Sequence, residues 1–373
     1  MMDNPYVIEF PICPQFFSGR KKELNIFSKR LEETVTSDPP SPHNIAIVGD
    51  WGIGKTSLLN KCLETASDRN CFICKITLTP EKCRNFEVFV YNTIDEIHST
   101  VWDSSLPTKI KEDISRWKIQ SFTLMGLKLE RTERVTHSSS TQFKSSLIAL
   151  WKTISRVPAA LIMYDDFHYL ANNYPDGLYD LRGVFQELRE FNCRYMLIVT
   201  GSMDMFSNIR GISEPLMRFF EHLELTSFTL IETIEAIEKP LKTKGANLVF
   251  DKNVVGAIYN KSLGHPYFVM FFAHDLFEHK QEGIIDLKLF NSVYDKIFEH
   301  LSASRFIKDY AIASDKEKEI LLKLNKEEGV IPEVKNVRIL LKRLVSKKLV
   351  VKTGRGKYKL YHPLFKEYLR RIK

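Results

Sequence analysis

The first two thirds of the chain alternate between short apolar runs and longer stretches with the periodicity of amphipathic helices. A first helix is predicted to begin near Lys21, where Leu24, Phe27 and Leu31 recur at helical spacing. Five later runs are apolar at almost every position, as strands buried on both faces are. They occupy 44–48, 72–78, 160–164, 195–200 and 222–225. Strands that alternate with helices are typical of a parallel sheet, so the pattern predicts an α/β core.

Two further regions lack clear strand signals. Residues 103–145 look less regular and end in the polar segment RTERVTHSSSTQ, from which we expect a mobile loop followed by a helix over 142–156. Residues 231–310 are helical by periodicity, with interruptions at GANLVFD and LGHPYF. We therefore expect a helical subdomain after the core.

The pattern changes again over 311–373. DKEKEILLKLNKEEG is an amphipathic helix and VKNVRILLKRLVSKKLV a second, basic one. LVVKTGRGKYKLYHP alternates apolar and polar residues around Gly354 and Gly356, which indicates a β-hairpin. Two helices followed by a hairpin are the order of a winged helix. The predicted divisions are 1–43, the core at 44–228, the helical subdomain at 229–310 and the winged helix at 311–373.

Charge and composition narrow the class of protein. No apolar run approaches the ~20 residues that span a bilayer, and the N-terminal residues lack the pattern of a secretory signal. We expect a cytoplasmic protein with no membrane partner.

Cys71 and Cys74 form a CxxC, but no second pair follows at zinc-site spacing, so we expect reduced structural thiols. The net charge is +8, and residues 335–373 alone carry +13.

The segment that follows the first strand has the composition of a phosphate-binding loop. It matches G-x-x-x-x-G-K-[ST] in full and comprises Gly49, Asp50, Trp51, Gly52, Ile53, Gly54, Lys55 and Thr56, followed by Ser57. The glycines let successive backbone N–H groups point at a phosphate, and Lys55 brings charge to the β- and γ-oxygens. Thr56 offers a hydroxyl to Mg²⁺. A strand before the motif and a helix after it favour nucleotide binding over a simple turn.

A second acidic element follows the strand ALIMY. Asp165 stands where a carboxylate can hold Mg²⁺ or its water, beside the phosphate loop. Asp166 is then placed to orient or deprotonate an attacking water. The alternative is a pair of solvated acids that cap the next helix.

With these motifs the chain resembles the archaeal-type P-loop ATPases of the AAA+ superfamily, which grade into STAND signalling ATPases and origin-recognition initiators. FFSGRKKEL looks like the adenine-side box, which implies that Gly19 and Arg20 lie near the base. YMLIVTGS looks like the sensor-1 strand, with Thr200 as its polar residue. EPLMRFFEHLEL is similar to the segment that brings an arginine finger to a neighbouring subunit, here Arg218.

The resemblance extends to SLGHPYF, which looks like the lid motif and implies that His265 and Pro266 lie over the nucleotide. It also implies ATP or ADP and Mg²⁺ as ligands and a homo-oligomer in the ATP state. Two positions depart from the pattern. Asp166 stands where most AAA+ proteins have Glu, which is expected to slow hydrolysis, although paired aspartates are usual in STAND proteins. His265 and Pro266 replace a sensor-2 arginine, and His265 either contacts phosphate or caps a helix.

The basic tail has two explanations. Basic helices and a Lys-rich hairpin neutralise DNA phosphates, and in a winged helix the helix at 336–348 enters the groove while the tip near Arg355 touches the backbone. The candidate DNA contacts are Lys342, Arg343, Lys347, Lys348, Arg355 and Lys357. Alternatively the tail is a basic face that is only solvated or that docks on an acidic protein surface.

Three functions remain open at this point. The first is an ATPase, slow or stimulated by a partner, whose nucleotide state controls self-association and whose tail binds duplex DNA. The second is a STAND-like switch that turns over rarely and recognises a protein partner through its tail. The third is a passive DNA-binding protein with a vestigial P-loop fold, against which the intact Lys55, Thr56 and Asp165 argue.

Overall fold

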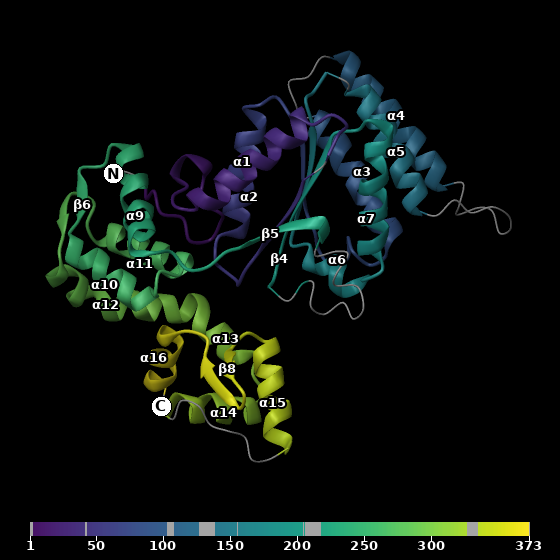
Figure 1. Cartoon of the computed structure of the whole chain (residues 1–373). Helices are drawn as coiled ribbons and strands as arrows, with labels where there is room; N and C mark the ends of the chain where they lie inside the picture. The colour runs from purple at the N-terminus through teal and green to yellow at the C-terminus, as the bar shows by residue number, and fades with distance from the viewer. Residues whose placement is uncertain are drawn as a thin grey trace. The chain divides into compact units, whose positions relative to one another are not determined.

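The computed structural model describes residues 3–41, 43–102, 108–126, 139–154, 156–203, 205, 218–326 and 335–372. The chain forms two compact units (Figure 1). The first, the core unit, is Pro11–Thr226, and the second, the C-terminal unit, joins Met1–Phe10 to Ser227–Lys373. The start of the chain belongs to the second unit because the Tyr6 hydroxyl donates a hydrogen bond to the Ile237 carbonyl oxygen at 2.7 Å.

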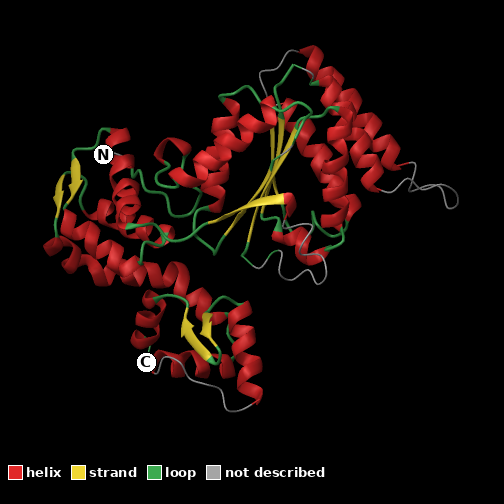
Figure 2. Cartoon of the chain, viewed as in Figure 1, coloured by secondary structure: helices red, strands yellow, loops and turns green. Residues whose placement is uncertain are grey.

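A five-stranded parallel sheet lies at the centre of the core unit, in the order β2-β3-β4-β1-β5 (Figure 2). The strands are β1 (Asn44–Val48), β2 (Phe72–Thr77), β3 (Ala160–Asp165), β4 (Tyr195–Gly201) and β5 (Phe220–Glu224). Each strand falls on one of the five apolar runs, and the predicted α/β class is confirmed. Because β4 lies between β1 and β3, the carboxyl ends of these three strands are neighbours.

Helices cover both faces of the sheet, as its continuously apolar strands require. One face carries α1 (Lys21–Thr36) and α2 (Lys55–Ser67). The other carries α3 (Phe86–Trp102), α5 (Ser139–Thr153) and α7 (Gly177–Leu188), while the short α6 (His168–Asn173) follows β3. Along β1 the side chains alternate between the two apolar clusters, Ile45 and Ile47 in one and Ala46 and Val48 in the other.

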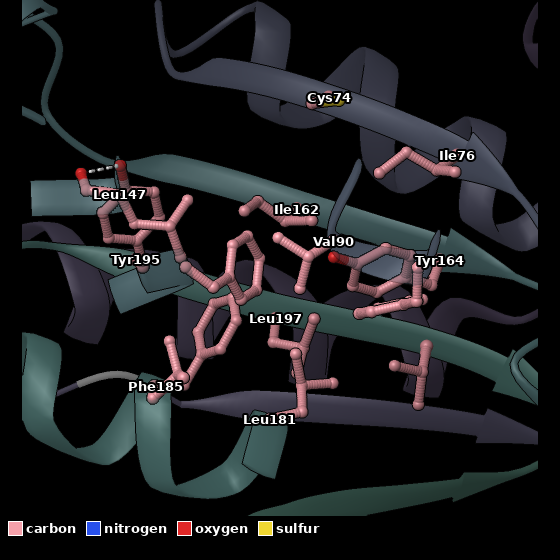
Figure 3. Packing of buried hydrophobic residues seen from close by; sticks show 14 of the residues in the cluster. Cys74, Ile76, Val90, Leu147, Ile162, Tyr164, Leu181, Phe185, Tyr195 and Leu197 are labelled. Atoms are coloured by element: carbon pink, nitrogen blue, oxygen red, sulfur yellow. Dashed lines mark hydrogen bonds between the residues drawn. The ribbon is translucent and has the colours of Figure 1, made fainter. Parts of the chain in front are cut away.

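The larger cluster is packed by aromatic and branched side chains from strands and helices (Figure 3). Its buried tyrosines have partners for their hydroxyls. The Tyr195 hydroxyl donates to the Leu147 carbonyl oxygen at 2.7 Å, and the Tyr164 hydroxyl lies 3.0 Å from Thr93 Oγ1. The polar atoms that reach this interior are therefore paired, which removes most of the cost of burying them.

A helix occupies part of the stretch in which we expected little regular structure. Residues Thr108–Gly126 form α4, which packs against α3 and α5. The apolar stripe is narrow, since Ile114 and Trp117 are buried among mostly polar neighbours, and the Trp117 indole N–H donates to the Ser146 carbonyl oxygen at 2.6 Å. Most of the polar segment RTERVTHSSSTQ lies outside the described residues.

The C-terminal unit begins with a helical subdomain, the lid, as expected for 229–310. Its helices are α9 (Leu230–Lys244), α10 (Lys252–Ser262), α11 (Pro266–His279), α12 (Leu287–Leu301), a π-helical turn Ser302–Phe306 and α13 (Ile307–Ala311). Two short strands, β6 (Leu248–Phe250) and β7 (Gly283–Ile285), pair in parallel within it. The interruption GANLVFD is therefore a strand rather than only a helix break.

A winged helix follows the lid. It consists of α14 (Asp315–Lys326), α15 (Lys335–Ser346), the antiparallel hairpin of β8 (Val350–Gly354) and β9 (Lys357–Leu360), called the wing below, and α16 (Pro363–Arg371). The predicted order of two helices and a hairpin is confirmed. The closing helix α16 was not predicted.

His362 fixes the start of α16 to the lid. Its Nδ1 accepts a hydrogen bond from the Leu364 N–H at 3.1 Å, and its Nε2 lies 2.9 Å from the Ser262 carbonyl oxygen. The ring therefore serves as the helix N-cap and, through Nε2–H, as a donor to the loop between α10 and α11. In the middle of α16, Glu367 accepts from the Tyr294 hydroxyl at 2.9 Å and lies 3.4 Å from Lys261 Nζ.

This arrangement needs a neutral imidazole, and burial lowers the pKa of His362 from 6.5 to about 4, against a smaller opposite effect of the Ser262 carbonyl. In the unfolded chain His362 takes up a proton once the pH falls below its ordinary pKa of 6.5. In the folded chain it takes up a proton only near pH 4, because its pKa is lowered to about 4. The free energy of unfolding should therefore fall by up to about 3 kcal/mol as the pH drops through this window.

We predict that His362→Asn removes this part of the pH dependence. An asparagine can still cap α16 through its side-chain oxygen, but it does not titrate. Urea titrations read at α16 by hydrogen-exchange mass spectrometry, at about pH 7 and about pH 4.5, measure the difference. Equal pH slopes for the two proteins would contradict the assignment.

A candidate nucleotide site at the carboxyl ends of the strands

The loop Gly49–Thr56 joins β1 to α2 and depends on its glycines. Gly52 and Gly54 have φ angles of 70° and 95°, a region that side chains with a Cβ rarely adopt. At Gly49 an added Cβ would lie 2.8 Å from Ile53 Cγ2 and 3.1 Å from the Leu225 carbonyl oxygen. Since Gly54 is the N-cap residue, no side chain caps α2. The first N–H groups of the helix can therefore face an anion.

Lys55, the first residue of α2, folds back over this loop. Its ammonium donates to the Gly49 carbonyl oxygen at 3.1 Å and to the Asp50 carbonyl oxygen at 2.8 Å. A phosphate in the loop would offer the ammonium a charged acceptor in place of these neutral ones. Ser57 Oγ, by contrast, accepts from the Ile12 N–H at 3.3 Å, which ties the N-terminal segment to α2.

Asp165 ends β3 and is the centre of a hydrogen-bonded group. Its Oδ1 accepts from the hydroxyls of Thr56, at 3.2 Å, and Thr200, at 2.5 Å. Its side chain is buried, and only 4% of the residue is exposed. The strand order brings the group together because β4, which carries Thr200, separates β1 from β3. The hydroxyl and carboxylate oxygens are hard donors of the kind that Mg²⁺ prefers.

Asp166 is held by its backbone rather than by its side chain. Its φ of 58° lies in the left-handed region, and its N–H donates to Thr200 Oγ1 at 3.0 Å. Thr200 therefore connects both aspartates. Burial and then the charge of Asp165 raise the pKa of Asp166, while His168 has its Nδ1 3.8 Å from Asp166 Oδ1 and lowers it. The carboxylate is 44% exposed and can reach a water.

Two titratable residues of this group, Lys75 and His168, were missed by sequence reasoning. Lys75, on β2, lies with its Nζ 3.9 Å from Asp165 Oδ2. His168 lies beside Asp166, at the start of α6. For Lys75 a signal was present, because a lysine within the apolar run FICKIT is unusual unless its charge has a partner. For His168 the position two residues after Asp166 indicated nothing by itself.

Arg20 supports the loop from the side. The residue is 4% exposed, and its Nη2 donates to the carbonyl oxygens of Ile53, at 3.1 Å, and Thr226, at 2.5 Å. Gly19 and Arg20 both have positive φ angles, which turn the chain into α1. These contacts explain a structural role for Arg20 beside the phosphate loop, and a contact of Gly19 or Arg20 with a base stays a prediction.

Three other candidate residues belong to other parts of the chain. Arg218 is exposed, two residues before β5. His265 and Pro266 belong to the C-terminal unit, where His265 is the N-cap residue of α11 and its ring contacts that of Phe268. The roles of these three residues toward a nucleotide stay predictions.

The candidate DNA contacts differ in their freedom to bind a partner. Lys342, Arg343, Lys348, Arg355 and Lys357 are exposed on α15, the wing and the turn between them. Lys347 instead donates to Glu317 Oε2 at 2.6 Å and to the Ile312 carbonyl oxygen at 2.8 Å. Glu317 is buried, so this ion pair joins α15 to α14 and withdraws Lys347 from the exposed set.

The chain is similar to a known family over residues 24–173 and to solved structures over almost its whole length. Residues 24–173, which contain the phosphate loop and both aspartates, match the model of the KAP family P-loop domain. The ORC2 protein of Aeropyrum pernix, in ADPNP and ADP complexes, is 15% identical, with 99% of this chain and 97% of that chain covered and a TM-score of 0.61. A Walker-type ATPase of Pyrococcus abyssi is 16% identical, with 95% and 96% covered and a TM-score of 0.59. The chain therefore shares its fold with these two proteins.

The Cdc6p protein of Pyrobaculum aerophilum shares this fold at 13% identity, with 100% of this chain and 99% of that chain covered and a TM-score of 0.50. No curated protein matches the chain. In the described ranges, none of the helices has the length and apolar character to cross a membrane. In the same ranges no group of three or more His, Cys, Asp and Glu side chains could hold a metal ion. Cys74 is buried, and burial raises the pKa of its thiol to about 12.

We predict that Asp166→Asn keeps nucleotide affinity and lowers turnover by about 100-fold or more, because an amide cannot accept the proton of water. Nucleotide titrations and steady-state phosphate release measure the two effects. Asp176→Asn, which changes an exposed aspartate near the start of α7, is the matched control and should leave both unchanged. If binding collapses in Asp166→Asn, then Asp166 is the metal residue and Asp165 takes the other role.

Proposed function

We propose that this protein is an ATP-binding and ATP-hydrolysing switch of the cytoplasm. Its nucleotide state controls association between copies of the chain, and its basic winged helix binds duplex DNA. The observation that carries the proposal is the hydrogen-bonded group of Thr56, Asp165 and Thr200 beside the phosphate loop. A structural turn between a strand and a helix has no need of a buried carboxylate with two hydroxyl partners, whereas a nucleotide site with a metal does.

Each residue of the site has a defined task under this proposal. The loop N–H groups and Lys55 bind the phosphates, and Thr56 and Asp165 would hold Mg²⁺. When bound, Mg²⁺ would offset the charge of the β- and γ-phosphate oxygens. Asp166 orients the attacking water and accepts its proton, and Thr200 keeps the two aspartates in register. The nucleotide complexes of the ORC2 protein, which has the same fold, support this reading.

Arg218 is the candidate for association-dependent hydrolysis. Arg218 is an exposed residue just before β5, where a second copy of the chain could contact it. An arginine supplied in trans stabilises charge on the transferred phosphoryl group, so hydrolysis would depend on assembly. The resemblance to AAA+ proteins, which place an arginine in this segment, motivates the assignment.

Lys55→Ala is expected to weaken ATP binding by at least about tenfold and to abolish hydrolysis, because a charge beside the phosphates is lost. The fold should survive, since the ammonium donates to carbonyl oxygens of the loop and contributes no apolar contact to the core. Lys61→Ala, which changes a lysine of the same helix that pairs with Glu64, is the matched control. ATP titrations, phosphate release and sedimentation with ATP or ADP measure binding, turnover and association. Undiminished hydrolysis in Lys55→Ala would refute the site.

The surface of the winged helix supports the DNA part of the proposal. Residues 335–373 carry fourteen Lys and Arg and the single acid Glu367, and α15 and the wing leave most of these cations exposed. Glu367 lies with the lid, where Tyr294 and Lys261 contact it. The exposed face is therefore almost purely cationic, which favours binding to the phosphate backbone of duplex DNA.

Replacing Lys342, Arg343 and Arg355 by Glu should weaken binding to all duplex sequences about equally if these side chains touch only phosphates. The logarithm of the affinity should fall with the logarithm of the salt concentration, with a slope of about 0.9 per phosphate contact. The slope measured for the variant should be smaller by the amount that up to three such contacts contribute. Replacing the exposed Lys288, Lys296 and Lys308 of the lid by Glu makes the same change in net charge and is the control. Fluorescence anisotropy with a labelled duplex measures both.

A second function is favoured by one observation. Asp166 is one methylene shorter than the usual glutamate, so its carboxylate reaches less far toward an attacking water, which slows the removal of the proton. A switch that turns over rarely and recognises a protein partner through its tail fits this property. Absence of any duplex affinity at low salt, with and without ATP, would make this second function the leading one.

A further inference from the structure

Lys75 is a charged residue in a strand that is otherwise built for burial. It lies in β2, where Cys74 and Ile76 on either side belong to the larger apolar cluster. The pleat of the strand places Lys75 on the opposite face, toward α2. There its ammonium donates to Asn60 Oδ1 of α2 at 2.6 Å. Asn60 therefore anchors the end of a side chain that would otherwise be free to reach solvent.

The anchored ammonium faces the second oxygen of Asp165. The distance from Lys75 Nζ to Asp165 Oδ2 is 3.9 Å, while Asp165 Oδ1 is taken by the hydroxyls of Thr56 and Thr200. The two oxygens of the carboxylate thus have different partners, neutral donors on one side and a fixed positive charge on the other. The side chain of Lys75 is 23% exposed, so water screens this charge less than that of a surface lysine.

A buried aspartate beside the phosphate loop creates an electrostatic problem. Its negative charge repels the phosphates of a nucleotide, and the repulsion is strong where water is excluded. A divalent cation at Thr56 and Asp165 would remove this repulsion. Without the cation, the positive charge of Lys75 is available for the same purpose, because it lies beside Asp165 in the structure as it stands.

We propose that Lys75 is a built-in counter-charge for Asp165, which lets the phosphate loop retain a nucleoside diphosphate in the absence of a divalent cation. The inference rests on the proposed nucleotide site and concerns the nucleotide that this site holds when no divalent cation is bound. Lys75 acts through Asp165 and is a positioning residue. A nucleoside diphosphate has fewer charges to offset than a triphosphate, so the fixed cation suits the diphosphate better.

The test compares ADP affinity with Mg²⁺ and in excess EDTA, by titration of a fluorescent ADP analogue. Lys75→Met should lose about tenfold in affinity in EDTA and much less with Mg²⁺, because the metal then supplies the missing charge. Lys75→Arg keeps the charge and should behave as the unaltered protein. Lys61→Met removes a lysine of α2 that pairs with Glu64, and should have no effect in either condition.

A second variant covers the case in which Lys75→Met folds poorly. Asn60→Ala leaves the charge but removes its anchor, and should lower ADP affinity in EDTA by a few-fold while affinity with Mg²⁺ stays the same. Equal affinity of Lys75→Met and the unaltered protein in EDTA would overturn the inference. So would an equal loss with and without Mg²⁺, which would indicate a purely structural lysine. Failure of the unaltered protein to bind ADP or ATP even with Mg²⁺ would instead overturn the proposed nucleotide site.

Discussion

The five parallel strands of the core unit are covered by helices on both faces, and this constraint decides where chemistry can occur. Inside the sheet every side chain must be apolar or have a partner, as the tyrosine hydroxyls of β3 and β4 do. Polar and charged groups can gather only where the strands end. The phosphate loop after β1, Asp165 at the end of β3 and Thr200 near the end of β4 are thereby placed side by side.

The group around Asp165 shows how a buried charge is tolerated. Two hydroxyls donate to one oxygen and an ammonium faces the other, so both lone-pair regions of the carboxylate have positive partners. The Thr200 hydroxyl accepts from the Asp166 N–H while it donates to Asp165. A shift of one aspartate would therefore move the other through this hydroxyl. The strained backbone at Asp166 persists because this hydrogen bond holds it.

Much of the fold could be predicted because the strongest local signals coincide with the elements that carry it. Apolar periodicity indicates the five strands, the first helix and the order of the winged helix. A single motif indicates the phosphate loop. The rest depends on partners far apart in the chain. The narrow apolar stripe of α4 is buried only because α4 packs against α3 and α5. The strand β6 is three residues long and is stabilised by pairing with β7.

The same limit applies to the site. Asp165, Asp166, Lys55 and Thr56 could be selected by motif. Lys75 gives only a local signal, a charge within an apolar run, and its partner Asp165 is identified only once β2 is seen next to β3. Lys347 shows the same limit, because its place in a basic stretch gives no sign of a partner within the chain. Its buried partner Glu317 comes from another helix, and no local pattern reveals that pair.

The junction of α16 with the lid has a consequence for the geometry of binding. The Phe228 N–H, just after the start of Ser227–Lys373, donates to the Gly264 carbonyl oxygen at 2.8 Å, and the adjoining Ser262 carbonyl accepts from His362. The linker, the lid and the winged helix are thus joined in series with no flexible tether between the last two. A binding surface on a flexible tether loses orientational freedom when it contacts a partner, whereas the basic helix α15 is already held in one orientation relative to the lid. Any partner that the tail binds would therefore be held in a set orientation relative to the lid.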